Sequence, residues 1–251
     1  MRRKLKRSCN AVIVVIGFLF LNDSNGYQTV TSSNSNYRIN DNKKFVVEQG
    51  SQSSLYDAAY MMTQARMAVS GLGGHLTDIT SPVFNLIYVQ QLARLKDNYT
   101  KDASQHQVLV ARNEASEIIG YVDVDQRNVF DAARYPTPYL SDCVVRSDWR
   151  QQGVASALVA ACGRLCADNW KQPYLHLWVE TSNLAAIRCY EKLQFVPIAA
   201  ETGPIDDVSQ IKTYRLQETK VGHWTRIKAD YMEYDRLLLR LCLLSGTSTS
   251  R

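Results

Sequence analysis

The alternation of apolar and polar residues divides the chain into helical and extended segments. Apolar side chains recur every three or four residues over 54–69 and 83–95, which predicts two amphipathic helices. A third helical pattern begins at Gly153 and continues to about Trp170, and a shorter one covers 183–193. Short apolar and aromatic runs around these patterns predict strands at 45–48, 107–111, 118–124, 139–145, 174–179, 195–198 and 236–243.

The first 26 residues have the composition of a secretory signal peptide. Five basic residues stand before position 10, and an uncharged apolar run follows from Ala11 to Leu21. That run is shorter than the roughly 20 residues that a transmembrane helix needs, which favours a signal peptide over a membrane span. Cleavage after Gly26 would lower the formal net charge from +5 to +1, because five basic residues and Asp23 would leave. A nearly neutral mature protein argues against nucleic acid or an anionic membrane as its partner.

The next segment, 27–43, is rich in Ser, Asn and Thr and predicts a disordered linker or transit segment. A signal peptide followed by an aromatic residue, here Tyr27, and by a hydroxylated, acid-poor tract resembles the bipartite presequences of algae with plastids of secondary origin. This resemblance implies a plastid location. Plain secretion and an uncleaved N-terminal anchor are the alternatives.

The rest of the chain is long enough for one well-buried domain, 44–245, followed by a frayed tail at 246–251. The six cysteines contain no C-x-x-C pair, so their spacing predicts neither a disulfide framework nor a metal site. Cys162 and Cys166 stand four residues apart on the third predicted helix. We expect them to be small buried residues in the core rather than metal ligands.

The most specific pattern is a strand, a loop and a helix that follow one another after residue 138. Strand 139–145 leads into Arg150-Gln151-Gln152-Gly153-Val154-Ala155, with a glycine where the helix begins. The first amides of a helix lack intrahelical acceptors and carry the positive end of the helix dipole, which suits a pyrophosphate. Glycine lets the backbone approach such an anion closely. After strand 174–179 the chain continues into N-x-x-A-x-x-x-Y, from Asn183 to Tyr190.

This R-x-x-G-x-A run, in the order strand, loop, helix, strand and second helix, resembles the acyl-CoA-binding region of the GNAT superfamily of N-acetyltransferases. The resemblance covers roughly residues 44–245 and is sharpest over 139–196. It implies an α+β fold, the GNAT fold, with a mostly antiparallel central sheet flanked by helices. Residues 138–141 and the loop are similar to plastid-type members of plants and algae. The resemblance also implies acetyl-CoA as co-substrate and direct transfer of acetyl to a primary amine.

The resemblance gives each matching position a role. The loop would hold the pyrophosphate, while the strand backbone and the asparagine would hold the pantetheine arm. The cofactor-binding residues are then Val144, Val145, Arg150, Gln151, Gln152, Gly153, Val154, Ala155 and Asn183. Asn183 can alternatively cap the helix that follows it, and both roles can hold at once. Tyr190 would donate a proton to the CoA thiolate as general acid, and its alternative role is packing.

The general base stays open between two carboxylates. Glu180 ends the second strand of the motif and Asp142 lies on the first, and either can equally be a structural charge. His176 lies within a strand, where we expect a packed core imidazole rather than a catalyst. Cys189 is adjacent to Tyr190, but helix spacing directs it elsewhere, so we do not expect a covalent mechanism.

The sequence therefore predicts an N-acetyltransferase whose acceptor is a protein N-terminus, a lysine or a small amine. The alternatives are a degenerate domain that binds acyl-CoA or a partner without turnover, and a secreted binding module that keeps the fold. Two residues depart from the family's pattern: Trp149 stands where a basic residue is common and Gln194 where glycine is common. The polar segment 199–232 either covers the acceptor groove or is a surface extension.

Overall fold

The computed structural model describes residues 44–69, 81–99, 102, 104–127, 135–203, 212–215 and 234–243. The predicted signal peptide, linker and tail lie outside the described residues, as does most of segment 199–232. The helices and strands are β1 (Phe45–Gln49), α1 (Ser54–Val69), α2 (Pro82–Asn98), β2 (His106–Asn113), β3 (Ile118–Asp125), β4 (Tyr139–Val145), α3 (Val154–Arg164), β5 (Tyr174–Glu180), α4 (Leu184–Lys192), β6 (Val196–Thr202), β7 (Lys212–Arg215) and β8 (Arg236–Cys242).

The predicted order of elements is confirmed, with two additions. A short strand, β7, lies inside the segment read as polar and mixed, and its four side chains are all exposed. The third predicted helix is α3 followed by one π-helical turn, η3 (Leu165–Asn169). Among the described residues, none of the helices combines the length and the apolar character needed to cross a bilayer.

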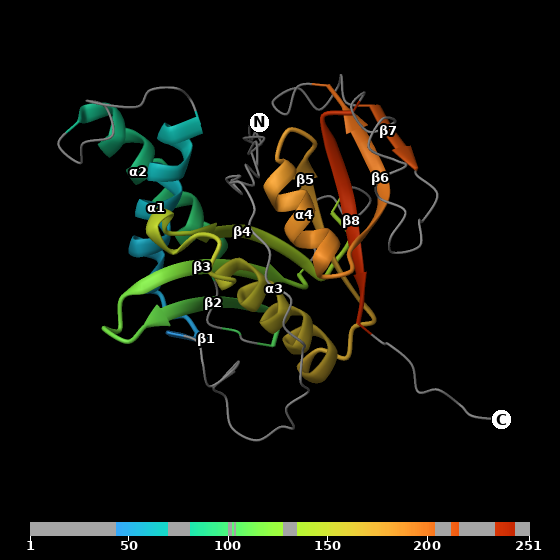
Figure 1. Ribbon diagram of the computed structural model, residues 1–251, viewed down its shortest axis with the longest axis horizontal. Coiled ribbons are helices and arrows are strands. Elements are labelled where there is room, and N and C mark those ends of the chain that lie inside the picture. The colour runs from blue at the N-terminus through green and yellow to red at the C-terminus, as the bar shows by residue number, and fades with distance from the viewer. Residues whose placement is uncertain are drawn as a thin grey trace, which may run out of the picture.

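The described strands form one sheet in the order β1-β2-β3-β4-β5-β8-β6-β7. The neighbours β4 and β5 run parallel, and the other paired strands are antiparallel. The predicted mostly antiparallel sheet is thus confirmed. In Figure 1, β2, β3 and β4 run across the view while β5, β6 and β8 run up it, so the sheet has two halves that meet between β4 and β5.

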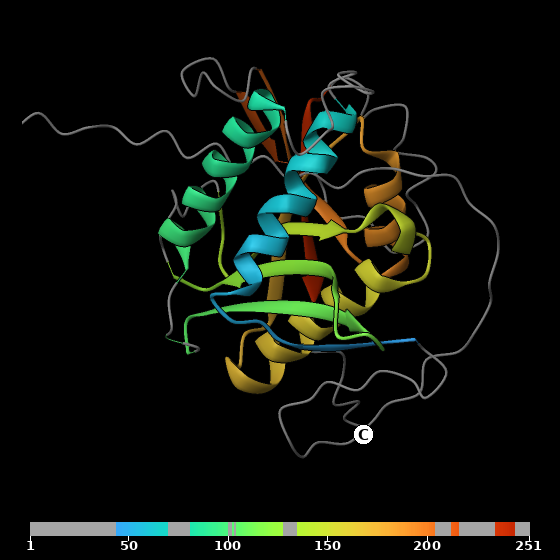
Figure 2. The same cartoon turned by 90° about the vertical axis from the view of Figure 1, so that its left-hand side faces the viewer.

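Helices cover both faces of the sheet. Residues Leu109 and Ala111 of β2 point to the face of α3 and α4, whereas Val108 and Val110 point to the face of α1 and α2. This alternation follows from the two-residue period of a strand. Figure 2 shows α1 and α2 in front of the strands and α3 beyond them. The predicted burial of Cys162 and Cys166 is confirmed, since both lie in the larger core cluster.

Candidate active site

Among the described strands, a single residue pair joins the two halves of the sheet. Tyr139 of β4 is paired with His176 of β5, and the amide of His176 donates to the carbonyl of Pro138 at 3.0 Å. Past Tyr139, no residue of β4 is paired with β5 among the described strands. The paired residue, Tyr139, is the first of β4, and the two strands run in the same direction. They therefore separate toward their carboxyl ends. Val144 and Val145, the predicted contacts of the pantetheine arm, lie on this open part of β4.

A bulge in β4 lies three residues past the last pair with β5. Tyr121 pairs with Val144 and Asp123 pairs with Ser141, so two residues of β4, Asp142 and Cys143, stand opposite one residue of β3. Asp142 has a φ of 55°, in the left-handed region. A bulge bends its strand and increases the local twist, which inclines β4 relative to β5.

The loop after β4 presents backbone amides at the open end. Gly153 caps α3 with φ 79° and ψ 7°, and Gln151 is also left-handed with φ 64°. Ala157 is the residue whose amide donates to the carbonyl of Gly153, at 3.0 Å, so the amides of the preceding turn have no intrahelical acceptor. The first turn of α3 contains no acidic residue. The loop therefore has the geometry and the charge that an anion requires.

The side chains of the loop fold back onto its own backbone. Arg150 Nε donates to the carbonyl of Val145 at 3.2 Å, and burial lowers the pKa of the half-buried guanidinium. Gln152 Nε2 donates to the carbonyl of Asp148 at 3.0 Å. Trp149, which departs from the family's pattern, packs against the larger core cluster. Its indole therefore anchors the loop, and the anion site depends on main-chain donors.

Helix α3 lies directly on β3 at Gly120. A Cβ atom added to Gly120 would come within 2.8 Å of Val154 Cγ1 and 2.9 Å of Leu158 Cδ1. Only a glycine admits this approach without displacement. The contact with β3 thus fixes the position of the α3 N-terminus, and it holds the loop from 150 to 155 at the open end of β4.

Tyr190 is the buried polar group of α4. Its side chain is 2% exposed, and its hydroxyl has no hydrogen-bond partner among the described residues. Burial, and then the thiols of Cys143 and Cys189, raise the pKa of Tyr190 well above its ordinary value. Tyr190 and Cys143, a residue of the bulge, belong to the same buried cluster, so the ring packs on the α3 and α4 side of β4. Tyr190 is therefore a protonated donor at neutral pH.

The ends of α4 explain two features of the sequence. Asn183 Oδ1 accepts from the amide of Ala186 at 3.2 Å, so the side chain caps the helix, which was one of its two expected roles. Gln194 adopts a φ of 70° just after the helix. A left-handed residue is required at this turn, which accounts for the glycine common in the family at this position.

The structure separates the two candidate bases. Both carboxylate oxygens of Asp142 accept from Arg94, at 2.7 and 2.9 Å, and the side chain is 3% exposed. Glu180 is half-buried at the carboxyl end of β5, and no described residue pairs with its carboxylate. Of the two, Glu180 is the carboxylate available to take a proton. Asp142 is occupied in an ion pair, which the sequence did not indicate.

His176 and Cys189 have the surroundings expected of residues that take no part in catalysis. His176 Nδ1 lies 3.3 Å from the carbonyl of Pro138 at the closed end of the gap, and burial lowers its pKa to about 4. The imidazole is therefore neutral at pH 7. Cys189 Sγ lies 3.4 Å from Ser156 Oγ, and burial raises the pKa of the thiol. A thiol with a raised pKa is a poor nucleophile.

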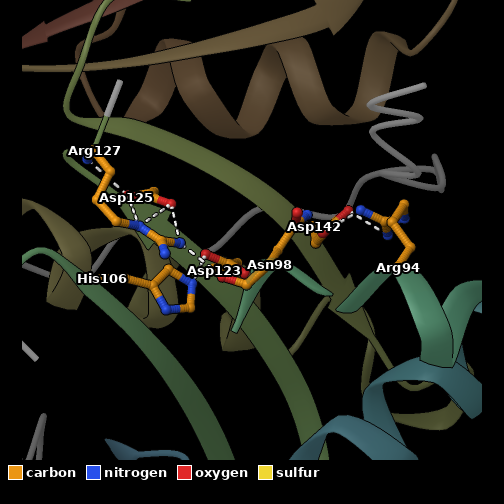
Figure 3. A network of polar contacts seen from close by, with 7 residues as sticks. All are labelled: Arg94, Asn98, His106, Asp123, Asp125, Arg127 and Asp142. Atoms are coloured by element: carbon orange, nitrogen blue, oxygen red, sulfur yellow. Dashed lines mark hydrogen bonds and ion pairs between the residues drawn. The ribbon is translucent and has the colours of Figure 1, made fainter. Parts of the chain in front are cut away.

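A polar network on the α2 side of the sheet was not predicted (Figure 3). His106 Nε2 lies 2.8 Å from Asp123 Oδ1, and both side chains are buried. Burial opposes the charge on His106, but the hydrogen bond and charge of Asp123 outweigh it and raise the pKa of His106. Arg127 binds Asp125 at 2.6 Å. The sequence carried one sign of this network. Asp123 and Asp125 are two residues apart in an otherwise apolar strand, so both side chains must lie on the same face of the sheet.

Together these features define an open α+β sheet whose parallel pair separates beside a helix N-terminus, which is the GNAT fold. The model of the acetyltransferase (GNAT) family matches residues 75–195, which include β4, the loop, α3, β5 and α4. Residues 75–195 thus resemble GNAT-family acetyltransferases, in agreement with the prediction made from residues 139 to 196.

One solved structure agrees with the fold, and a second is similar to the chain. The chain is similar to the ribosomal-protein-S5-alanine acetyltransferase of Vibrio fischeri, with 14% identity, 84% of this chain and 98% of that chain covered, and a TM-score of 0.50. It is also similar to the spermidine N-acetyltransferase of Vibrio cholerae in complex with CoA and spermine, with 10% identity, 80% and 96% coverage, and a TM-score of 0.47. No curated protein sequence matches the chain at a significant level.

Proposed function

We propose that the protein is an acetyl-CoA-dependent N-acetyltransferase that transfers acetyl directly to a primary amine. The observation that carries this proposal is the Tyr190 hydroxyl, which is buried, protonated and without a partner among the described residues. A polar group in that state costs stability unless it acts on a ligand. It lies in the family's general-acid position, beside the open part of β4.

The residues present fit acetyl-CoA. The free amides at the start of α3 would hold the pyrophosphate, with Gly153 in the left-handed conformation that turns them outward. The unpaired edge of β4 at Val144 and Val145 would hydrogen-bond the pantetheine arm. Asn183 uses Oδ1 as a cap, which leaves its Nδ2 group to donate to the same arm. Bound there, acetyl-CoA supplies an activated acyl group and a thiolate leaving group.

Proton transfer is divided between two residues of the chain. Tyr190 donates its phenolic proton to the departing thiolate, and its raised pKa means that the phenol is still protonated when the thiolate leaves. The amine must lose a proton before it attacks, and Glu180 at the carboxyl end of β5 is the carboxylate free to accept it, directly or through water.

The acceptor is a protein N-terminus, a lysine side chain or a small amine. The similar solved enzymes act on ribosomal-protein alanine and on spermidine, which represent two of these three classes. The likeness of residues 138–141 to plastid-type members favours a protein acceptor. Tyr214, on the exposed strand β7, belongs to the segment that would cover the acceptor groove.

A mass-spectrometric acceptor screen tests the proposal. The purified chain is incubated with acetyl-CoA and with three sets of acceptors: peptides with free N-termini, N-terminally blocked lysine peptides, and small amines including spermidine. We expect one set to gain an acetyl group with release of an equal amount of CoA. Binding of acetyl-CoA without transfer to any set would instead identify a degenerate domain, and an absence of binding would refute the proposal.

We also propose that residues 1–26 are removed as a signal peptide and that 27–43 directs the protein to a plastid of secondary origin. The support is the charge and hydropathy of these residues together with Tyr27 at the expected mature N-terminus. Sequencing the N-terminus of the protein isolated from its cell would test the cleavage. Recovery of an intact Met1 would favour the N-terminal anchor, and recovery from the medium would favour secretion.

A further inference from the structure

The bulge of β4 depends on a residue that lies far from it in sequence. Arg94 of α2 and Asp142 of β4 are 48 positions apart, yet the guanidinium binds the carboxylate through two parallel hydrogen bonds of 2.7 and 2.9 Å (Figure 3). Such a bidentate pair fixes orientation as well as distance. We call this pair the Arg94–Asp142 clamp.

The guanidinium is itself held in place on α2. Gln91 Oε1 accepts from Arg94 at 3.1 and 3.3 Å, and Met62 Sδ of α1 lies 3.9 Å away. The arginine side chain is 26% exposed. Burial lowers the pKa of Arg94, but the charge and hydrogen bonds of Asp142 outweigh this and raise it, so the guanidinium stays charged. The clamp therefore ties both helices of one face to β4.

The clamped residue has the unusual backbone conformation. Asp142 has a φ of 55°, which L-residues adopt at a cost and which aspartate tolerates better than most. Asp142 stands with Cys143 opposite a single residue of β3, so its conformation is the bulge. The clamp thus acts on the residue that inclines β4 away from β5, and the inclination sets the gap where Val144 and Val145 would meet acetyl-CoA.

We propose that Arg94 is a positioning residue for acetyl transfer. By binding Asp142 it holds the left-handed bulge of β4 and so keeps the gap between β4 and β5 in the form that accepts the thioester end of acetyl-CoA. This inference rests on the proposed function. It assigns Asp142 a role in backbone geometry and removes it as a general base.

A double-mutant cycle separates the bulge from the charge. Arg94→Gln should weaken acetyl-CoA binding, measured by calorimetry, at least about tenfold, because it leaves a buried carboxylate unpaired and releases the bulge. Asp142→Gly removes the carboxylate while glycine keeps the left-handed conformation without help. In the Asp142→Gly background, Arg94→Gln should then change the acetyl-CoA affinity by less than about threefold. An equal effect of Arg94→Gln in both backgrounds would overturn the proposal.

Two further variants keep the test open if Arg94→Gln does not fold. Arg94→Lys preserves the charge but cannot form both hydrogen bonds, and it should weaken binding by a smaller factor in the same direction. The matched control is Arg112→Gln, which removes an arginine of similar exposure, 29%, paired with Glu48 on β1. The control should leave acetyl-CoA affinity unchanged. Equal losses in Arg112→Gln and Arg94→Lys would refute a specific clamp.

Asp142→Asn distinguishes the clamp from a catalytic carboxylate. Asparagine tolerates the left-handed region and still accepts a hydrogen bond, so acetyl-CoA affinity and kcat should each fall by less than about tenfold. Loss of a general base would instead lower kcat by about 10² to 10⁴, remove the basic limb of the pH profile and spare the affinity. That outcome would restore Asp142 as the base and refute the clamp.

Amide hydrogen exchange of β4 provides a measure that does not need a working enzyme. Exchange at residues 141–145 should be faster in Arg94→Gln than in the unaltered protein, and unchanged in Arg112→Gln. If the unaltered protein does not bind acetyl-CoA, the proposed function fails while the exchange still judges the clamp. Unaltered exchange in Arg94→Gln would refute the clamp whatever the activity.

Discussion

Replacing Tyr190 by phenylalanine should stabilise the protein without ligand and slow its turnover. The hydroxyl is buried and has no partner among the described residues, so its desolvation is uncompensated in the folded state. Removing such a group returns about 1 kcal/mol of folding free energy, toward the lower end of the cost of an unsatisfied buried hydroxyl. For a domain of this size the melting temperature should rise by about 2–4 °C.

The effect on catalysis has the opposite sign. A positioned general acid contributes about 10² to 10⁴ to the rate, which corresponds to roughly 3 to 5 kcal/mol of barrier. Tyr190→Phe should therefore lower kcat by that factor while the KM for acetyl-CoA changes little, because the phenol acts on the leaving thiolate rather than on the bound cofactor. The ring contact with Phe195, at 5.4 Å between centroids, is retained by phenylalanine.

Thermal unfolding and steady-state CoA release on the same preparations measure both effects. Tyr174→Phe is the matched control, since the Tyr174 side chain is 37% exposed and lies at the amino-terminal end of β5, away from the gap. Neither the melting temperature nor kcat should change in this variant. A fall in the melting temperature of Tyr190→Phe would show that the hydroxyl has a structural partner. An unchanged kcat would reassign the acid.

Gly153→Glu should abolish acetyl-CoA binding, because a negative side chain at a φ of 79° both strains the backbone and faces the anion site. Unchanged affinity would show that the loop does not bind the pyrophosphate. Gly120→Ala should lower the unfolding free energy by about 1–3 kcal/mol, because its methyl group would meet Val154 and Leu158 below 3 Å; a stability loss under that range would show that α3 can shift freely. The free energy of unfolding should fall by roughly 3 kcal/mol from pH 6.5 to pH 4 because of His176. Its folded-state pKa of about 4 lies below the unfolded value, so between these two pH values the unfolded chain binds a proton that the folded protein does not. His176→Gln should remove that slope in denaturant titrations, and an identical slope would assign it to other groups.

Local patterns predicted most of the fold. The helices α1 and α2 were visible from their apolar periodicity, and the hairpin of β2 and β3 from two apolar runs around a polar turn. Strand β7 was missed because its residues, Lys-Thr-Tyr-Arg, are all exposed, and the strand is defined by its pairing with β6. Pairing across a sheet edge requires no apolar signal, so periodicity could not reveal it.

The candidate site was predictable where it depends on backbone, and not where it depends on distant partners. Gly153 indicated the start of the helix, because glycine favours a left-handed cap, and in the structure Gly153 is the left-handed N-cap of α3. Asn183 was read as either ligand or cap, and the cap is present. Asp142 was read as a possible base because nothing near it in sequence identified Arg94, which appears only as a polar position on an amphipathic helix. The pairing exists only once α2 is folded over β4.

Three costs meet at the open end of β4 and β5, and their coincidence is the strongest argument for a ligand site. Among the described residues, the edge of β4 that faces β5 has no strand partner past Tyr139, the first amides of α3 have no intrahelical acceptor, and the Tyr190 hydroxyl has no hydrogen-bond partner. Any one of these occurs by itself in folded proteins. Their concentration in one gap, framed by a bulge that Arg94 holds, is what a fold selected for stability alone would remove. A long ligand with an anion at one end and a leaving group at the other would satisfy all three at once.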